Sequence, residues 1–392
     1  MKRGVLQLGT GPLQRALLER IAAVGLQPIA VDRDPQPAGL IPSVVHVRAP
    51  IDDPAAILRA LESRISGIEI GAVLTSIDLG VRSVSVVASA LGLPHATIDS
   101  IRAMDDKQAA KEMLARSGVA VPMGIVVRSC ADLVLPDEAA EVVVKPVDSS
   151  GSRGVKRARG RHAIEDAIRD ALSFSDRALV EEFVEGHHLD VNGTVLGGEF
   201  HLVSIGSRFF TPPPVCVPIY GGFTAHDDGA LRVRVTELMQ RAVDAFGYRH
   251  GPVKADLIDS RRGLVALELA ARFHGDIVSV HTAEAAGRPP AALHWLSRLG
   301  LCSLPEARPR AGAWFAIFPP EAGKISGIEG LDTIGVLPGH RSWIARKQIG
   351  SRVGPPSDNR AVVGFGLFSG SDSVGLWSDA RRRRKSIRVE VM

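Results

Sequence analysis

The sequence is poor in the residue types that mark several common protein classes. It has only 3 cysteines and 2 tyrosines in 392 residues. The cysteines, Cys130, Cys216 and Cys302, are far apart and form neither a CxxC motif nor a metal-type spacing, so they indicate reduced thiols. No apolar run approaches the roughly 18 residues that a membrane span needs, and the N-terminus has no secretion signal. We therefore expect a cytoplasmic protein with no membrane partner.

Charge of one sign is also not in large excess. The net charge is +4, so global electrostatics do not require a nucleic-acid partner. The densest basic run is RRRRK at Arg381 to Lys385, which lacks interleaved aromatic residues and follows Ser378, a suitable helix N-cap. We interpret it as a short, solvated helix whose cations favour its C-terminal end. Nucleic-acid binding is the less favoured alternative.

The apolar and glycine content is that of an ordinary globular protein. Apolar residues make up 45% of the chain, and apolar runs alternate with helical patterns. This alternation predicts the α/β class, and the length predicts two or three domains. In the first hundred residues, a buried strand at 4–9, a helix from about 12 and a second strand at 27–31 predict a small doubly wound domain.

The start of this domain imitates a dinucleotide-binding fingerprint. Gly9 and Gly11 follow a strand, and Asp32 stands about twenty positions further on. Gln14 occupies the place of the third glycine and would crowd the approach of the helix to the strand. We favour a βαβ unit that serves as scaffold, and an NAD-dependent oxidoreductase remains the alternative.

The middle of the chain combines lysines with a loop of small residues. A helix at 104–117 carries Lys107 and Lys111 on one face, and Lys145 ends the strand EVVVKPV. Directly after it comes DSSGSRGV at 148–155, whose backbone amides and hydroxyls could surround phosphate. A solvated helix face and a plain hairpin turn are the alternatives to phosphate binding.

A further strand, ALVEEFV, carries the adjacent acids Glu181 and Glu182. Because side chains alternate along a strand, one of them faces inward if the other faces out. An inward carboxylate could accept a hydrogen bond from an adenine amino group or a ribose hydroxyl. A surface edge with both acids solvated is the alternative.

The stretch VKADLIDSRRGLVALELAARFHGD at 253–276 predicts two strands joined by a turn at SRRG. Lys254 and Asp256 share one face of the first strand. A three- or five-residue loop would place Asp256 opposite Glu268, where like charges repel unless a cation lies between them. Two carboxylates without thiol or imidazole suit Mg²⁺, and Arg272 follows at the end of the second strand. An exposed hairpin with scattered charges is the alternative.

Four motifs in order, MDDK, VVVKPVDSSGSRGV, LVEEFVEG and ADLI…ALELAAR, make the chain resemble the ATP-grasp superfamily of carboxylate–amine ligases. Within it, the chain is most similar to the L-amino acid ligase and carbamoyl-phosphate-synthetase-like branch. The resemblance implies an N-terminal pre-ATP-grasp domain at 1–100 and an ATP-grasp domain at 101–300 with a flexible lid at about 120–185. It also implies a small C-terminal α+β subdomain at 301–392 that completes the active-site side.

The resemblance also implies roles for single residues. It implies ATP and Mg²⁺, with Mn²⁺ as a substitute, and small-molecule carboxylate and amine substrates. The first domain would form a homodimer by family analogy. The implied phosphate-binding residues are Lys107 and Lys145, with the flap residues Ser149, Ser150, Gly151 and Gly154. The adenine-binding hinge would be Glu181, Glu182, Phe183 and Val184, the metal ligands Asp256 and Glu268, and the residue that stabilises an acyl phosphate Arg272.

Two positions depart from the family pattern. His188 stands where relatives carry a carboxylate for the ribose, and Ala270 stands where they carry a metal-binding asparagine. The expected activity is ATP-dependent amide or dipeptide formation through an acyl phosphate, and an ATP-binding protein with impaired turnover is an alternative. His274 and Gly275 are expected to border the substrate, although a packed or solvated histidine fits His274 equally well.

Overall fold

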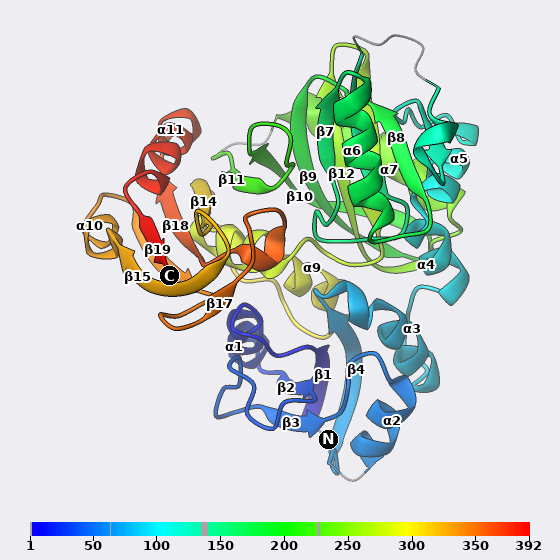
Figure 1. Cartoon of the computed structure of the whole chain (residues 1–392). Coiled ribbons are helices and arrows are strands. Elements are labelled where there is room, and N and C mark those ends of the chain that lie inside the picture. The colour runs from blue at the N-terminus through cyan, green and yellow to red at the C-terminus, as the bar shows by residue number, and fades with distance from the viewer. Residues whose placement is uncertain (1, 63, 135–139, 226–227) are drawn as a thin grey trace.

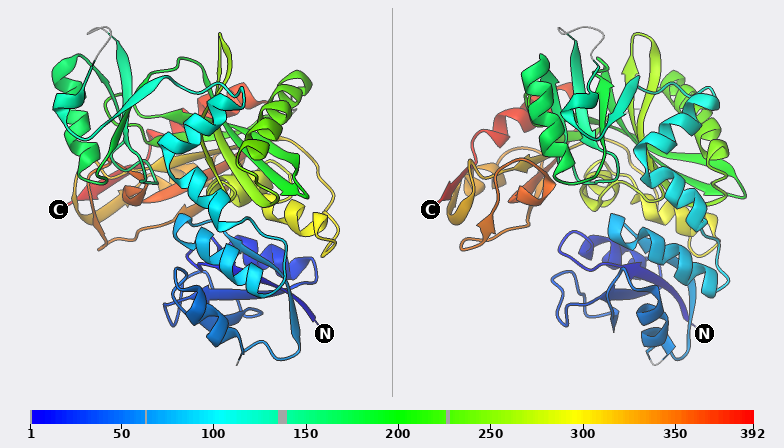
Figure 2. Two further views of the ribbon diagram at one scale, coloured as in Figure 1. Left: turned by 90° about the vertical axis from the view of Figure 1, so that its right-hand side faces the viewer. Right: turned by 45° about the vertical axis from the view of Figure 1, so that its right-hand side comes forward.

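The computed structural model describes residues 2–62, 64–134, 140–225 and 228–392, so residues 135–139 of the expected lid lie outside the description. The predicted α/β class is confirmed. The chain forms an N-terminal unit at one end of the molecule, a lid packed over a large antiparallel sheet, and a C-terminal part at the far end of that sheet (Figures 1 and 2). Among the described residues, no helix is both long and apolar enough to cross a membrane.

The N-terminal unit is a parallel four-stranded sheet in the order β3-β2-β1-β4. Alternate residues of β1 face opposite layers, with Val5 packed toward α1 and Leu6 toward α2 and α3. Helices on both faces make the unit doubly wound, as predicted. Its elements are β1 (Lys2–Leu8), α1 (Arg15–Ala23), β2 (Gln27–Asp32), β3 (Val45–Arg48), α2 (Pro54–Glu62), β4 (Ile68–Thr75) and α3 (Val81–Ala90).

Two helices, α4 (Ile98–Asp105) and α5 (Lys107–Arg116), connect this unit to the lid. The prediction of one helix over 104–117 is wrong at its start, because the extended backbone of Asp106 interrupts the helix and separates α4 from α5. The Asp106 side chain accepts hydrogen bonds from the backbone amides of Gln108 and Ala109, both at 3.0 Å, and so caps α5. The cap sets Lys107 at the first position of the helix.

The lid is an antiparallel four-stranded sheet in the order β5-β8-β6-β7. One face packs against α6, where Ile164 and Ile168 bury against Val142 and Val144 of the sheet. The other face is turned toward the large sheet (Figure 1). The lid elements are β5 (Gly124–Val127), β6 (Glu141–Pro146), β7 (Lys156–Arg159), α6 (Arg161–Leu172) and β8 (Ala178–Glu182).

The large sheet has eight strands in the order β13-β12-β9-β10-β11-β14-β18-β16. It crosses the expected boundary at residue 300, because β11 pairs with β14 of the last hundred residues. Helix α7 covers one face, with Val235 and Met239 buried against Val191 and Val253. The strands and helices up to residue 300 are β9 (His187–Leu196), β10 (Glu199–Phe210), β11 (Pro218–Phe223), α7 (Gly229–Ala245), β12 (His250–Ser260), β13 (Gly263–Ala270), α8 (Ala283–Ala285) and α9 (Ala291–Arg298).

The C-terminal part adds a three-stranded sheet in the order β17-β15-β19 to the end of the large sheet. Its last helix begins at Ser373, so Ser378 lies inside the helix and the prediction that it is an N-cap is wrong. The elements are β14 (Ala311–Ile317), β15 (Gly323–Glu329), α10 (Leu331–Gly335), β16 (His340–Ala345), β17 (Arg352–Val353), β18 (Gly364–Gly370), α11 (Ser373–Arg384) and β19 (Arg388–Val391).

Gly154, at the end of the loop between β6 and β7, cannot carry a side chain without strain. Its φ is +67°, and a Cβ there would lie 2.8 Å from the Phe174 side chain and 3.3 Å from the Ala171 Cα. Left-handed backbone strain costs about 1–2 kcal/mol, and overpacking about 1–3 kcal/mol more. We predict that Gly154→Ala destabilises the lid by about 2–5 kcal/mol, measured by hydrogen exchange of the lid amides.

Gly151 provides the matched control. Its φ of +70° is similar, but no atom lies within 4 Å of a Cβ built there. Gly151→Ala should therefore show only the backbone strain of about 1–2 kcal/mol. Equal losses in the two variants would contradict the packing role of Gly154.

Candidate active site

A cavity of about 440 Å³ lies between the inner face of the lid and the large sheet. Its size is in the range of small-molecule sites. Its lining includes Lys107, Lys145 and the acids Asp256 and Glu268, so the structure brings together groups that are distant in the sequence. The other predicted residues in its lining are Ser149, Ser150, Gly151, Glu181, Glu182, Phe183, Val184 and His188.

The hairpin of β12 and β13 sets the two acids opposite each other, as predicted, but by a different route. Ser260 pairs with Gly263 across a two-residue turn, not the expected three- or five-residue loop. Such a turn alone would oppose Asp256 to Leu267. A β-bulge between Asp256 and the turn leaves Leu267 unpaired and restores the pairing of Asp256 with Glu268.

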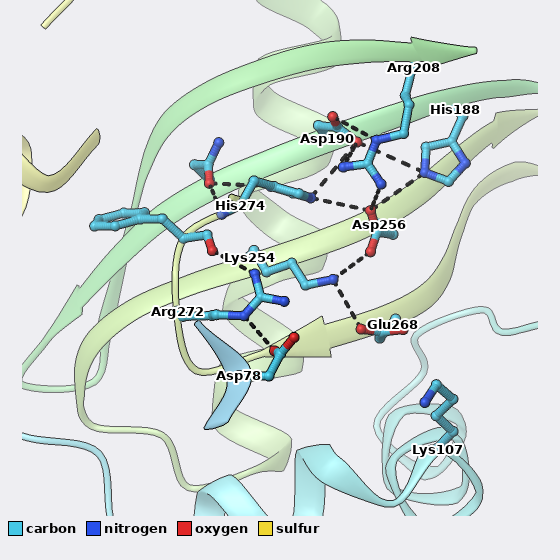
Figure 3. A network of polar contacts seen from close by, with 12 residues as sticks. Asp78, Lys107, His188, Asp190, Arg208, Lys254, Asp256, Glu268, Arg272 and His274 are labelled. Atoms are coloured by element: carbon cyan, nitrogen blue, oxygen red, sulfur yellow. Dashed lines mark hydrogen bonds and ion pairs between the residues drawn. The ribbon is translucent and has the colours of Figure 1, made fainter. Parts of the chain in front are cut away.

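Lys254 neutralises this facing pair from within the protein. Its Nζ lies 2.6 Å from Asp256 Oδ2 and 3.0 Å from Glu268 Oε1 (Figure 3). Burial lowers the pKa of Lys254, but Asp256 and Glu268 outweigh burial and raise it. The cation that the sequence predicts between the two acids is therefore supplied in part by the protein, because the buried Lys254 ammonium lies between the two carboxylates.

The other Asp256 oxygen, Oδ1, belongs to a second buried cluster. It lies 3.2 Å from Arg208 Nη1, 3.2 Å from His274 Nε2 and 3.5 Å from His188 Nε2. Burial raises the pKa of Asp256, yet Lys254 and Arg208 together hold it well below its usual value. Asp256 is therefore a carboxylate at neutral pH.

Arg208 also holds a third acid, Asp190 of β9. Its Nε and Nη2 lie 3.0 and 2.8 Å from the two Asp190 oxygens, a bidentate pair. His188, Asp190 and Asp256 could also offer ligand atoms to a metal, since these atoms all lie within 4.8 Å of one another. The Arg208 guanidinium already pairs with both acids. We therefore infer that Arg208, and not a metal ion, is the cation that neutralises this cluster.

His274 is absent from the lining of the described cavity and is packed in the interior, which is the alternative that the sequence left open. Its ring is buried, and Nδ1 faces Asn192 Oδ1 at 3.2 Å while Nε2 faces Asp256. The chain turns inward after β13, because the His274 backbone amide donates to Asn192 Oδ1 at 2.8 Å. Burial lowers the pKa of His274. The neighbouring Gly275 is exposed and stays a predicted substrate contact.

Lys107, the first residue of α5, is hydrogen-bonded to the backbone of the loop at 148–155, which we call the flap. Lys107 Nζ donates to the carbonyl oxygen of Ser149 at 2.6 Å, and burial lowers its pKa. Ser149 Oγ is buried and has no hydrogen-bond partner among the described residues. Buried hydroxyls are normally hydrogen-bonded, so this one is suited to bind a ligand. Gly154 is buried beside α6 and is absent from the cavity lining, so its predicted contact with nucleotide is replaced by a packing role.

The two adjacent acids of β8 face opposite sides, as the alternation of the strand predicts. Glu181 is buried, and its oxygens pair with Lys145 at 2.7 Å and with Lys111. Burial and the Lys145 charge lower the pKa of Lys111 to about 7. Glu182 is turned to the surface, where it accepts a hydrogen bond from the Met123 amide at 2.9 Å.

Arg272 reaches from the end of β13 to the N-terminal unit. Its Nε lies 2.5 Å from Oδ1 of Asp78, which follows β4 (Figure 3). Arg272 is absent from the lining of the described cavity but acts electrostatically on Lys254, Asp256 and Glu268. It therefore stands between the acids and the N-terminal unit.

Several residues of this network were not predicted. Lys254 could have been found, since strand alternation places it on the face of Asp256. Asp190 and Arg208 had no such signal, because they come from β9 and β10 and meet Asp256 only through the order of strands in the sheet. Asp78 had none either, since it lies in a separate unit.

Of the two predicted metal ligands, Asp256 and Glu268, one is well placed to bind a divalent ion. Mg²⁺ prefers carboxylate oxygens together with phosphate and water. The Glu268 side chain is 32% exposed and lines the cavity, whereas that of Asp256 is 12% exposed and has partners on both oxygens. Glu268 is therefore the more accessible ligand.

We predict that Asp256→Asn destabilises the protein by about 3–5 kcal/mol, because it removes the buried carboxylate that pairs with both Lys254 and Arg208. Thermal unfolding at neutral pH measures this loss. The pKa of Asp256 is depressed in the folded state, so its stabilisation is present above the ordinary value near 4 and disappears as the pH falls through the lower folded value. The difference between wild type and variant should shrink below about pH 4.

Asp259→Asn on the same strand is the control. Asp259 pairs with Arg234 through side chains that are 32% and 46% exposed. Its loss should cost less than about 1 kcal/mol. A loss for Asp256→Asn as small as that of the control would contradict the buried network.

Comparisons with known proteins agree with this geometry. Residues 104–276 match the ATP-grasp domain family, and residues 316–392 match L-amino acid ligase C-terminal domain 2. An uncharacterized protein of Sinorhizobium fredii is 23% identical over 348 residues, which cover 83% of this chain and 70% of that protein. The D-alanine–D-alanine ligase of Coprothermobacter proteolyticus is 32% identical over 102 residues, 24% of this chain, and the chain spans only 33% of that ligase.

The fold as a whole is similar to that of a solved structure. The L-amino acid ligase from Bacillus licheniformis superposes with a TM-score of 0.81 at 19% identity, covering 100% of this chain and 99% of that one. The predicted fold class, an α/β ATP-grasp fold preceded by a doubly wound unit, is confirmed. Residues 104–276 therefore match an ATP-grasp domain and residues 316–392 an L-amino acid ligase C-terminal domain, and the fold of the whole chain is similar to that of a solved L-amino acid ligase.

Proposed function

We propose that this protein activates the carboxylate of an amino acid with ATP and joins it to an amine, with release of ADP and phosphate. One observation carries the proposal. Asp256 and Glu268 face the same cavity as Lys107 and Lys145, which is the arrangement needed to hold a metal-bound polyphosphate. The names of the relatives, L-amino acid ligase and D-alanine–D-alanine ligase, support the substrate class.

The nucleotide would lie along the cavity between lid and sheet. Val143, Val155, Ile258 and Leu267 give the lining apolar surfaces suited to a base. The phosphates would meet Lys107 and the free Ser149 hydroxyl. Lys145 would contribute through its pair with Glu181, and His188 would border the ribose.

The chemistry needs positioning and charge neutralisation more than proton transfer. A substrate carboxylate oxygen would attack the γ-phosphorus as the bond to ADP breaks, and an amine would then displace phosphate from the acyl carbon. Mg²⁺ held by Glu268, with Asp256 beside it, would neutralise charge on the phosphates. Lys107 and the flap would hold the triphosphate in line and exclude water.

Arg272 would act where the acyl group lies. It is buried between the acids and Asp78, and the pKa of its guanidinium is raised despite burial, because Asp78 and the active-site acids favour its charged form. A fixed cation at this place would stabilise the acyl phosphate and the tetrahedral intermediate. Exposed Gly275, three residues further on, would border the substrate.

The NAD alternative has little support. Asp32, which would bind the ribose, accepts hydrogen bonds from the amides of Thr10 and Asp34, both at 3.0 Å. The chain at Gly39 lies directly over the glycine turn, since its amide donates to the Thr10 carbonyl at 2.9 Å. The place of a pyrophosphate is therefore filled by the protein.

An ATP-binding protein with impaired turnover is the second candidate, because both Asp256 oxygens have protein partners and residue 270 is alanine. The deciding experiment is a screen for ADP release over pairs of amino acids and amines, with product mass determined. Release of ADP with an amide product supports the ligase. Binding of ATP without turnover on any pair supports the second candidate.

Glu268→Gln should lower ADP release on the order of 100-fold or more, since it removes the accessible metal ligand. Steady-state ADP release at saturating Mg²⁺ measures this, and excess chelator should abolish the activity of the wild type. Asp259→Asn on the same hairpin is the control and should retain full activity. Wild-type rates in the Glu268 variant would rule out the metal assignment.

Arg272→Ala should raise the barrier by about 3–4 kcal/mol, as loss of an oxyanion donor does. The measurement is kcat for ADP release. Asp78→Asn tests the structural alternative, because it breaks the ion pair but keeps the guanidinium. If both variants lost the same activity, Arg272 would serve only to hold the N-terminal unit.

A further inference from the structure

Lys254 occupies the space in which two facing carboxylates would share a divalent ion. Its Nζ lies within 3.0 Å of an oxygen of each acid, and the side chain is 7% exposed. If the ammonium left this position, Asp256 would keep Arg208 as its cation but Glu268 Oε1 would lose Lys254, and removing one partner from a buried ion pair is costly. The ammonium is therefore a built-in cation of the site.

Asp256 has a protein partner on each of its two oxygens, so a metal ion would have to compete with these partners. Oδ2 is held by Lys254 at 2.6 Å, and Oδ1 lies 3.2 Å from both Arg208 Nη1 and His274 Nε2. Ala270, opposite Lys254 in the hairpin, offers only a methyl group. Of the residues that could complete a second ion site on this hairpin, none offers a free ligand atom.

Glu268 differs from Asp256 in this respect. Within the described part of the chain, only its Oε1 has a partner, Lys254, and its side chain is 32% exposed and lines the cavity that Lys107 also lines. One carboxylate oxygen together with phosphate oxygens and water suffices for one Mg²⁺. The accessible donors of this site therefore match a single ion.

We propose that this site binds a single divalent ion with its nucleotide, through Glu268, and that Lys254 takes the place of a second ion between Asp256 and Glu268. The inference rests on the proposed binding of ATP and deepens it. It predicts that the metal requirement is met by one ion per nucleotide.

The test is the Mn²⁺ stoichiometry of the complex with a non-hydrolysable ATP analogue, measured by electron paramagnetic resonance of free Mn²⁺. We expect one bound Mn²⁺ per complex of the wild-type protein. Two bound ions would overturn the inference and leave ATP binding intact. No bound analogue and no bound Mn²⁺ would overturn the proposed function and the inference with it.

A double variant, Lys254→Met with Ala270→Asn, tests the role of Lys254 itself. It removes the ammonium and adds an oxygen ligand, so the count should rise from one to two. Lys254→Arg with Ala270→Asn, which keeps the cation, is the matched control and should stay at one. A count of one in both double variants would overturn the role of Lys254.

Stability gives a readout that does not depend on nucleotide. Lys254→Met leaves the two acids without their shared cation, so its unfolding temperature should fall and Mn²⁺ alone should restore part of the loss. The same Mn²⁺ concentration should shift the wild type less. An equal shift in both proteins would show that Lys254 does not occupy an ion position.

Discussion

The opposition of Asp256 and Glu268 across β12 and β13, with Lys254 between them, is the interaction on which the site depends. Two carboxylates that face each other across paired strands repel strongly where the dielectric constant is low. The hairpin therefore needs a cation between Asp256 and Glu268. The protein supplies Lys254 from the same strand as Asp256 and Arg208 from β10. The acids thus remain charged and face the cavity, which is the property that nucleotide chemistry requires.

The cavity exists because other parts of the chain hold the lid against this hairpin. The Gly151 carbonyl accepts from the Asn359 amide at 3.3 Å, and the Arg157 amide donates to the Pro214 carbonyl at 2.8 Å. A side-chain hydrogen bond joins Ser150 to Asp78 of the N-terminal unit. The lid and its flap therefore contact the N-terminal unit, the loop between β10 and β11, and the C-terminal part at once. If the lid closed over a ligand, its contacts with all three parts would change.

Local patterns predicted the elements that carry the site. The alternation of β12 and β13 placed the acids on one face, and the β-branched run before Lys145 placed that lysine at a strand end. Errors arose where one side chain outweighed a pattern. Asp106 caps α5 and splits a helix that periodicity joined, and a bulge at Leu267 corrects the register of a turn of unexpected length.

Long-range arrangement was the part that no local pattern carried. Asp190 and Arg208 reach Asp256 only because β12 pairs with β9 and β9 with β10. His274 was expected at the substrate, but its own backbone amide donates a hydrogen bond to Asn192 Oδ1 of β9 and holds the residue in the interior. The contact of Arg272 with Asp78 requires two units to meet. Such contacts follow from the order of strands and units, which the motifs alone did not specify.

The central claim is that the cavity between lid and hairpin holds a metal-bound nucleoside triphosphate. Thermal unfolding of the wild-type protein with Mg²⁺·ATP and, separately, with NAD tests it most directly. A ligand at 100 times its Kd stabilises the folded state by about 2.7 kcal/mol, so Mg²⁺·ATP should raise the unfolding temperature by a measurable amount, whereas NAD should leave it unchanged. Stabilisation by NAD without any effect of Mg²⁺·ATP would contradict the account.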